Sequence, residues 1–116
     1  SIAYLLRTSG YIVEPFNSVF SFLESNDLET PGCVLIDLIM PEISGIEAMQ
    51  LLDKRQIRFP VIIMSAYGDI EKAVSAVKQG ACEYLEKPFA KNKVITACNI
   101  CSCMMVSPVE KNRSFI

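Results

Sequence analysis

Short, continuously apolar runs alternate along the chain with longer segments in which apolar residues recur every three or four positions. The runs at residues 33–36 and 61–64 have the composition of strands that are buried on both faces of a parallel sheet. A third short strand is expected at residues 82–85, and another, earlier in the chain, at residues 11–16. The pattern therefore predicts four strands separated by segments of helical length.

Helices are predicted where the three- to four-residue spacing coincides with end signals. Residues 2–8 form the first expected helix, with Gly10 in the place of a C-terminal cap. Asn17 is the expected N-cap of the second helix. The apolar face of that helix comprises Val19, Phe22 and Leu23. Ser44 and Glu47 have the spacing of a capping box and predict a third helix that extends to about residue 56. Its buried side carries Leu51 and Leu52.

Two more helices are expected in the second half of the chain. Asp69 is the expected cap of the first, which Gly80 ends. Its apolar stripe, expected to lie in the core, consists of Ala73, Val74, Ala76 and Val77. The last helix is expected to begin at about Lys91.

This alternation of strands and helices indicates the fold class. Strands separated by helix-length segments imply right-handed crossovers and an open parallel sheet with helices on both faces, a doubly wound α/β fold. The ligand site of such a sheet lies beyond the carboxyl ends of its strands. Asp37, Ser65 and Lys87 each stand at the end of one of three successive predicted strands, so we expect them to share one crevice.

Composition narrows the class further. With 116 residues, of which 51% are hydrophobic, the chain is expected to form one globular domain. The net charge of -2 comes from 13 acidic and 11 basic residues that are scattered along the chain, so nucleic-acid binding is not expected. No apolar run approaches the roughly 18 residues of a membrane span, and no signal peptide is recognisable. We therefore expect a cytoplasmic protein that does not bind membranes.

The five cysteines raise the question of disulfides or metal. Their number is odd and the chain has no histidine, so reduced thiols are the expectation. Cys98, Cys101 and Cys103 resemble part of a metal knuckle, but a structural zinc site needs four Cys or His ligands. Small apolar residues on a helix are the simpler interpretation of this cluster.

A carboxylate, a hydroxyl and an ammonium in one crevice could handle a phosphoryl group. Aspartate can act as the nucleophile, while serine and lysine can bind phosphoryl oxygens. Taken one at a time, Asp37 could instead be a cap, Ser65 a turn hydroxyl and Lys87 a solvated charge. The motifs around these residues favour the joint interpretation.

Four stretches carry a family resemblance: residues 34–41, Gly45, residues 60–66 and residues 80–89. In order and spacing they resemble the receiver domains of response regulators in two-component systems, over about residues 2–96. The resemblance implies a flavodoxin-like receiver fold and a domain at residues 1–96, followed at 97–116 by an atypical last-helix segment and tail. Many relatives continue into a helix-turn-helix domain, which is not expected within this chain.

The resemblance also implies roles for individual residues. Asp37 corresponds to the phosphoacceptor, and Ser65, Ala66 and Lys87 correspond to phosphoryl-binding positions. Ser65 is also a switch position. A second switch position is Tyr84, and the peptide bond between Lys87 and Pro88 is expected to be cis, as is usual in the family.

Receiver domains also bind a divalent metal, normally Mg²⁺. The carboxylate of Asp37 and the backbone carbonyl of Ile39 correspond to two of its ligands. The family's first strand, which ends in two acidic ligands, has no counterpart here, so the receiver fold is expected to lack that strand. Residues 11–16 would then lose their main neighbour, and we expect marginal stability and poor magnesium binding. A natural protein that is longer at its N-terminus and a truncated gene product both remain open.

The resemblance predicts a phosphorylation-dependent switch that is not an enzyme. A sensor histidine kinase would donate to Asp37, and a second receiver could bind through the helix after Asp69. Ile39 and Tyr67 would flank the water that hydrolyses the aspartyl phosphate, and because neither can orient it, slow dephosphorylation is expected. One alternative is a pseudo-receiver that docks partners without phosphorylation. Another is an aspartate-nucleophile phosphatase, although such enzymes place a second acid where Ile39 stands.

Overall fold

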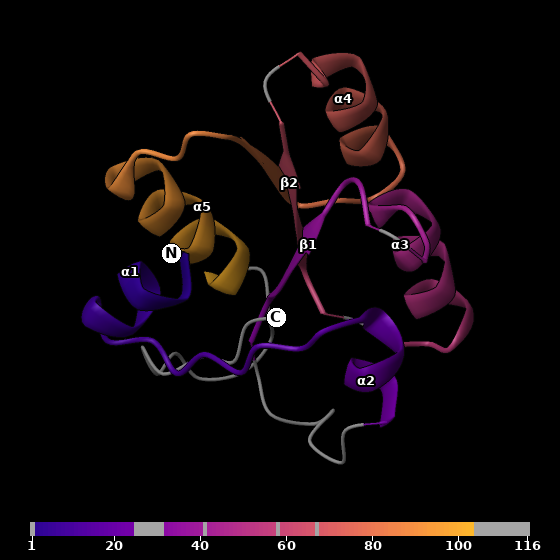
Figure 1. The fold of residues 1–116 in the computed structure, drawn as a ribbon, viewed down its shortest axis with the longest axis horizontal. Coiled ribbons are helices and arrows are strands. Elements are labelled where there is room, and N and C mark those ends of the chain that lie inside the picture. The colour runs from indigo at the N-terminus through magenta and orange to yellow at the C-terminus, as the bar shows by residue number, and fades with distance from the viewer. Residues whose placement is uncertain (1, 25–31, 41, 58, 67, 104–116) are drawn as a thin grey trace.

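The structure, a computed structural model, describes residues 2–24, 32–40, 42–57, 59–66 and 68–103, without the side chains of the last two residues. Within these residues a parallel sheet lies between two layers of helices (Figure 1). The doubly wound α/β architecture expected from the sequence is therefore confirmed.

Three strands form the sheet in the described part of the chain. They are β1 (Val34–Asp37), β2 (Val61–Ser65) and β3 (Glu83–Glu86), in the order β1-β2-β3 and all parallel. Each coincides with a predicted strand to within one residue at either end. The register sets Asp37 beside Met64 and Ser65 beside Glu86, so the carboxyl ends of the strands meet at one edge.

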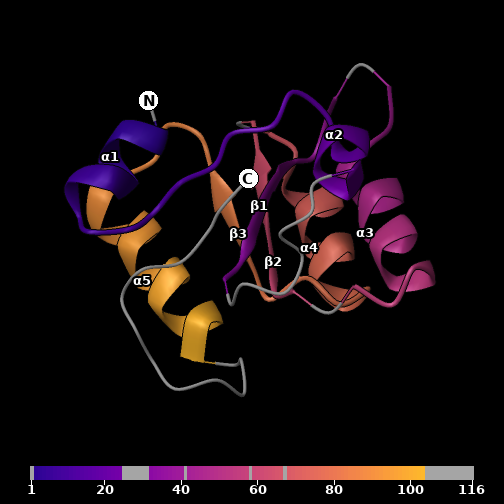
Figure 2. The same cartoon turned by 90° about the horizontal axis from the view of Figure 1, so that it is seen from below.

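Helices cover both faces of this sheet. They are α1 (Ile2–Thr8), α2 (Val19–Glu24), α3 (Gly45–Lys54), α4 (Ile70–Lys78) and α5 (Lys91–Cys103). Figure 2 shows α1 and α5 on one face and α2, α3 and α4 on the other. None of these helices, within the described residues, has the length and apolar content needed to cross a bilayer.

The core follows the alternation of side chains along the buried strands. In β2, Val61 and Ile63 pack toward the layer of α2, α3 and α4, whereas Ile62 and Met64 pack toward α1 and α5. All five residues of this strand are buried. Successive side chains of a strand point to opposite faces, so a central strand covered on both sides needs an unbroken apolar run.

The helix ends largely follow the sequence signals. The capping box of Ser44 and Glu47 is formed, and Gly10 and Gly80 adopt positive φ angles of 96° and 121° after their helices. Asn17 was the wrong cap for α2, because Ser18 Oγ accepts the backbone N–H of Ser21 instead.

Asp69 occupies the N-cap position of α4 as expected, but among the described groups its side chain makes no capping hydrogen bond. The predicted stripe of α4 was also too wide. Ala73 and Ala76 are completely buried, whereas Val74 and Val77 are 40% and 37% exposed. Small residues bring the helix close to the sheet, and the helical rotation of about 100° per residue turns the adjacent valines outward.

Residues 11–16 form no strand, although the structure describes all of them. The local pattern predicted one, but the sheet of the described residues consists of β1, β2 and β3, and residues 11–16 pair with none of these strands. Other contacts hold it in place. Arg7 Nη2 donates to the carbonyl of Val13 at 3.1 Å, and the Tyr11 hydroxyl donates to Oδ1 of Asn99 on α5.

The expectation of reduced thiols was wrong for one pair of cysteines. Cys82, just before β3, forms a disulfide with Cys101 of α5, and their Cα atoms are 6.0 Å apart. Cys98 is a buried free thiol. The side chain of Cys103 is outside the part of the chain that the structure describes. The described residues contain no group of three or more Cys, Asp or Glu that could hold a metal.

Candidate functional site

Three polar residues meet at the carboxyl edge of the sheet. Asp37 and Ser65 are the last residues of β1 and β2, and Lys87 directly follows β3. The backbone N–H of Lys87 donates to the carbonyl of Ser65 at 2.8 Å, which continues the ladder one residue beyond β3. The register of the parallel strands thus brings together the residues that sequence reasoning placed in one crevice.

An ion pair links the two charged members of this group. Lys87 Nζ lies 2.9 Å from Asp37 Oδ1, and the side chains are 48% and 41% exposed. Ion pairs this accessible contribute only about 0–1 kcal/mol to stability. The pair therefore adds little to folding, and it holds an ammonium beside a carboxylate that solvent can reach.

Ser65 is the buried member of the three. It is 1% exposed, and its hydroxyl donates to the carbonyl of Leu85 at 3.4 Å, near the upper limit for a hydrogen bond. Ala66, the other expected phosphoryl-binding residue, is exposed and directly follows Ser65.

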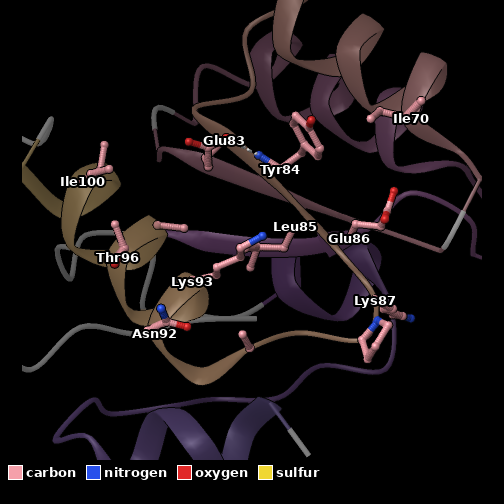
Figure 3. A pocket seen from close by; sticks show the side chains of 13 residues that line it. Ile70, Glu83, Tyr84, Leu85, Glu86, Lys87, Asn92, Lys93, Thr96 and Ile100 are labelled. Atoms are coloured by element: carbon pink, nitrogen blue, oxygen red, sulfur yellow. Dashed lines mark hydrogen bonds between the residues drawn. The ribbon is translucent and has the colours of Figure 1, made fainter.

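Tyr84 belongs to the same strand as Leu85 and is half-buried. Its side chain packs against the core on the side of α2, α3 and α4. In Figure 3 its ring lies on the side of β3 that faces Ile70 of α4, away from Lys93 and Thr96 of α5. The peptide bond between Lys87 and Pro88 is cis.

Gly45 is a site residue whose role sequence reasoning missed. A Cβ at this position would lie 2.7 Å from the carbonyl oxygen of Asp37 and 3.0 Å from Cα of Leu38. Its backbone N–H also donates to the carbonyl of Leu38 at 2.7 Å. The first residue of α3 thus braces the backbone at Asp37. The glycine inside the capping box was the available signal, but its tight contact depends on tertiary packing.

The described residues do not make a complete magnesium site. Mg²⁺ requires near-octahedral oxygen coordination and is usually held by one or two carboxylates together with water. Asp37 and the carbonyl of Ile39 are the expected donors, yet no group of three acidic or thiol side chains gathers among the described residues. The side chain of Ile39 is 64% exposed, and Tyr67 lies outside the described residues.

Comparison with known proteins identifies the family. Residues 1–99 match the response regulator receiver domain. The chain therefore belongs to the response-regulator receiver domains of two-component systems. Its fold is similar to that of the crystal structure of FixJ-N, with a TM-score of 0.84 and 33% identity over 92% of this chain and 86% of that one.

Curated relatives are transcriptional regulators by name. The transcriptional regulatory protein FixJ of Azorhizobium caulinodans is 40% identical over 97 residues, which cover 84% of this chain and 46% of the relative. The transcriptional regulatory protein TdiR of Thauera aromatica is 36% identical over 99 residues, or 85% of this chain and 44% of the relative. The chain spans about half the length of the curated relatives it matches.

Proposed function

We propose that this chain is a phosphoacceptor that takes a phosphoryl group from a histidine kinase onto Asp37. The observation that supports this most strongly is the exposed carboxylate of Asp37, 2.9 Å from the ammonium of Lys87 at the carboxyl edge of the sheet. A carboxylate oxygen attacks phosphorus, the bond from phosphorus to the kinase histidine breaks, and an acyl phosphate forms. Lys87 faces the phosphoryl charge.

Phosphorylation then shifts an equilibrium between two conformations. The hydroxyl of Ser65 turns from the carbonyl of Leu85 to a phosphoryl oxygen, a charge-assisted acceptor that forms a stronger hydrogen bond than a neutral carbonyl at 3.4 Å. Tyr84, which precedes Leu85 on β3, then moves further inward. Such a change biases states that already exist in the unphosphorylated protein.

The response is read on the outer face of α4. Ile70, Val74 and Val77 are each more than a third exposed there and lie at positions i, i+4 and i+7 of one helix. This ridge is close to Tyr84, whose ring faces Ile70 (Figure 3). A second copy of the receiver is the proposed partner, because an apolar ridge can pair with its own equivalent across a two-fold axis.

One alternative also has an observation in its favour. A pseudo-receiver would dock partners without being phosphorylated, and the lack of an acidic cluster among the described residues is consistent with that function. An aspartate phosphatase is disfavoured, because Ile39 stands where a second acid would act. The proposed function is therefore a phosphorylated switch and not a hydrolase.

The test is intact mass after incubation with acetyl phosphate and magnesium. It is carried out on this chain and on a version with an added N-terminal strand that ends in two acidic residues. We expect a gain of one phosphoryl group on the extended form, retained in Asp53→Asn, which changes an exposed acid of α3, and abolished in Asp37→Asn. No gain on either form would favour the pseudo-receiver.

A further inference from the structure

Two cysteines from different elements meet at the end of the molecule opposite Asp37. Cys82 precedes β3 and Cys101 lies in the last turns of α5, and their disulfide joins residues 19 positions apart. Since β3 runs from Cys82 toward Lys87, the disulfide lies at the amino edge of the sheet. It is therefore separate from the phosphoryl site.

The two sulfur atoms differ in accessibility. Cys101 is completely buried between α5 and the sheet, whereas Cys82 is only partly buried. The side chain of Cys82 packs at the edge of the core cluster that α1 and α5 cover, and Cys101 belongs to the interior of that cluster. A reagent from solvent therefore meets Cys82 before Cys101, and the disulfide shows that the sulfur of Cys101 can reach that of Cys82.

We propose that Cys82 and Cys101 form a reversible redox modification site whose oxidant is a low-molecular-weight disulfide. The Cys82 thiolate attacks one sulfur of the reagent, which gives a mixed disulfide and releases one thiol. The Cys101 thiolate then attacks the sulfur of Cys82, the protein disulfide forms, and the second thiol leaves. The reagent gains two electrons, and the two cysteine protons end on the released thiols.

The disulfide controls how firmly α5 is attached to the sheet. The fully buried side chains described for α5 are small, namely Val94, Ala97, Cys98 and Cys101, and the larger Ile95 packs against the core only near the start of the helix. Such a face buries little apolar surface, so non-covalent packing holds the end of the helix weakly. Oxidation adds to this packing a covalent link between α5 and the residue that precedes β3. The proposal depends on the fold and not on phosphoryl transfer.

The first test maps the thiols. The reduced 116-residue chain is incubated with oxidised glutathione, quenched with N-ethylmaleimide, digested and analysed by mass spectrometry. We expect a linked pair of peptides containing Cys82 and Cys101, and the same pair in Cys98→Ala, which removes the buried thiol one turn away. Cys82→Ser should show no link. Persistent alkylation of Cys82, or a link from Cys82 to another cysteine, would overturn the proposal.

The second test uses no substitution of Cys82 or Cys101, so its result can be interpreted even if Cys82→Ser does not fold. Closing a loop of this size is expected to raise the thermal midpoint of the oxidised wild type above that of the reduced wild type by about 10 °C. Cys98→Ala should show the same difference between its two redox forms. Equal midpoints of oxidised and reduced wild type would contradict a disulfide that fastens α5.

Discussion

Gly45 is the residue through which the packing of α3 most directly affects the backbone of Asp37. In Gly45→Ala the new methyl group would lie 2.7 Å from the carbonyl oxygen of Asp37, and backbone atoms cannot move aside as a side-chain end can. Overpacking of this kind costs about 1–3 kcal/mol. The higher helix propensity of alanine offsets up to about 1 kcal/mol of that cost. The net destabilisation therefore lies between about 0 and 3 kcal/mol, with about 1–2 kcal/mol as the central expectation.

Urea unfolding followed by circular dichroism measures this loss directly, and the thermal midpoint should fall by about 4–8 °C per kcal/mol. Gly80→Ala is the control, because Gly80 has a φ of 121° and a Cβ added there would meet no atom within 4 Å. Its cost is backbone strain far from Asp37. Both variants should lose stability, but only Gly45→Ala should also slow phosphoryl uptake in the extended form.

Two outcomes would refute this reasoning. If Gly45→Ala unfolds at the same urea concentration as wild type or higher, the backbone of α3 does not approach Asp37 as closely as the structure indicates. If both glycine variants slow phosphoryl uptake equally, the loss reflects general stability and not the position of Asp37.

The other predictions concern the remaining residues of the site and the proposed interface. Lys87→Ala should change the free energy of unfolding by less than about 1 kcal/mol, because its ion pair is exposed. It should nevertheless sharply reduce the conformational response to phosphorylation. A large loss of stability in urea would contradict this prediction. Ser65→Ala should keep phosphoryl uptake but lose the accompanying change in the near-ultraviolet spectrum of Tyr84, and an unchanged spectral response would refute the switch. Ile39→Ala should speed decay of the aspartyl phosphate by at least about twofold, measured by mass over time, and a smaller change would remove the basis for shielding. Val74→Glu should abolish phosphorylation-dependent self-association in sedimentation velocity, and dimers that persist would rule out the ridge on α4.

Buried strands made the fold and the edge of the sheet predictable. Each apolar run needed cover on both faces, and parallel strands separated by helices place their carboxyl ends together. The proximity of Asp37 and Lys87 could therefore be predicted from the apolar run that precedes each of them in the sequence. The capping box of Ser44 also depends only on residues close in sequence, and it is formed in the structure.

The features that sequence reasoning missed depend on neighbours that a local pattern does not contain. Residues 11–16 have a strand-like pattern, but a strand also requires backbone pairing with a neighbouring strand, and these residues pair with none of β1, β2 and β3. The rotation of α4 that exposes Val74 was set by small residues against the sheet. The pairing of Cys82 with Cys101 depends on how α5 crosses the sheet, which cysteine spacing alone does not reveal.

The central claim is that Asp37 accepts a phosphoryl group, and locating the modified residue tests it most directly. The extended form is treated with acetyl phosphate and magnesium and then reduced with borohydride, which converts an aspartyl phosphate to homoserine. Tandem mass spectrometry of the digest then identifies the modified position. We predict homoserine at position 37 and at no other aspartate. Homoserine elsewhere, or unmodified Asp37 in a chain that has gained a phosphoryl group, would contradict the claim.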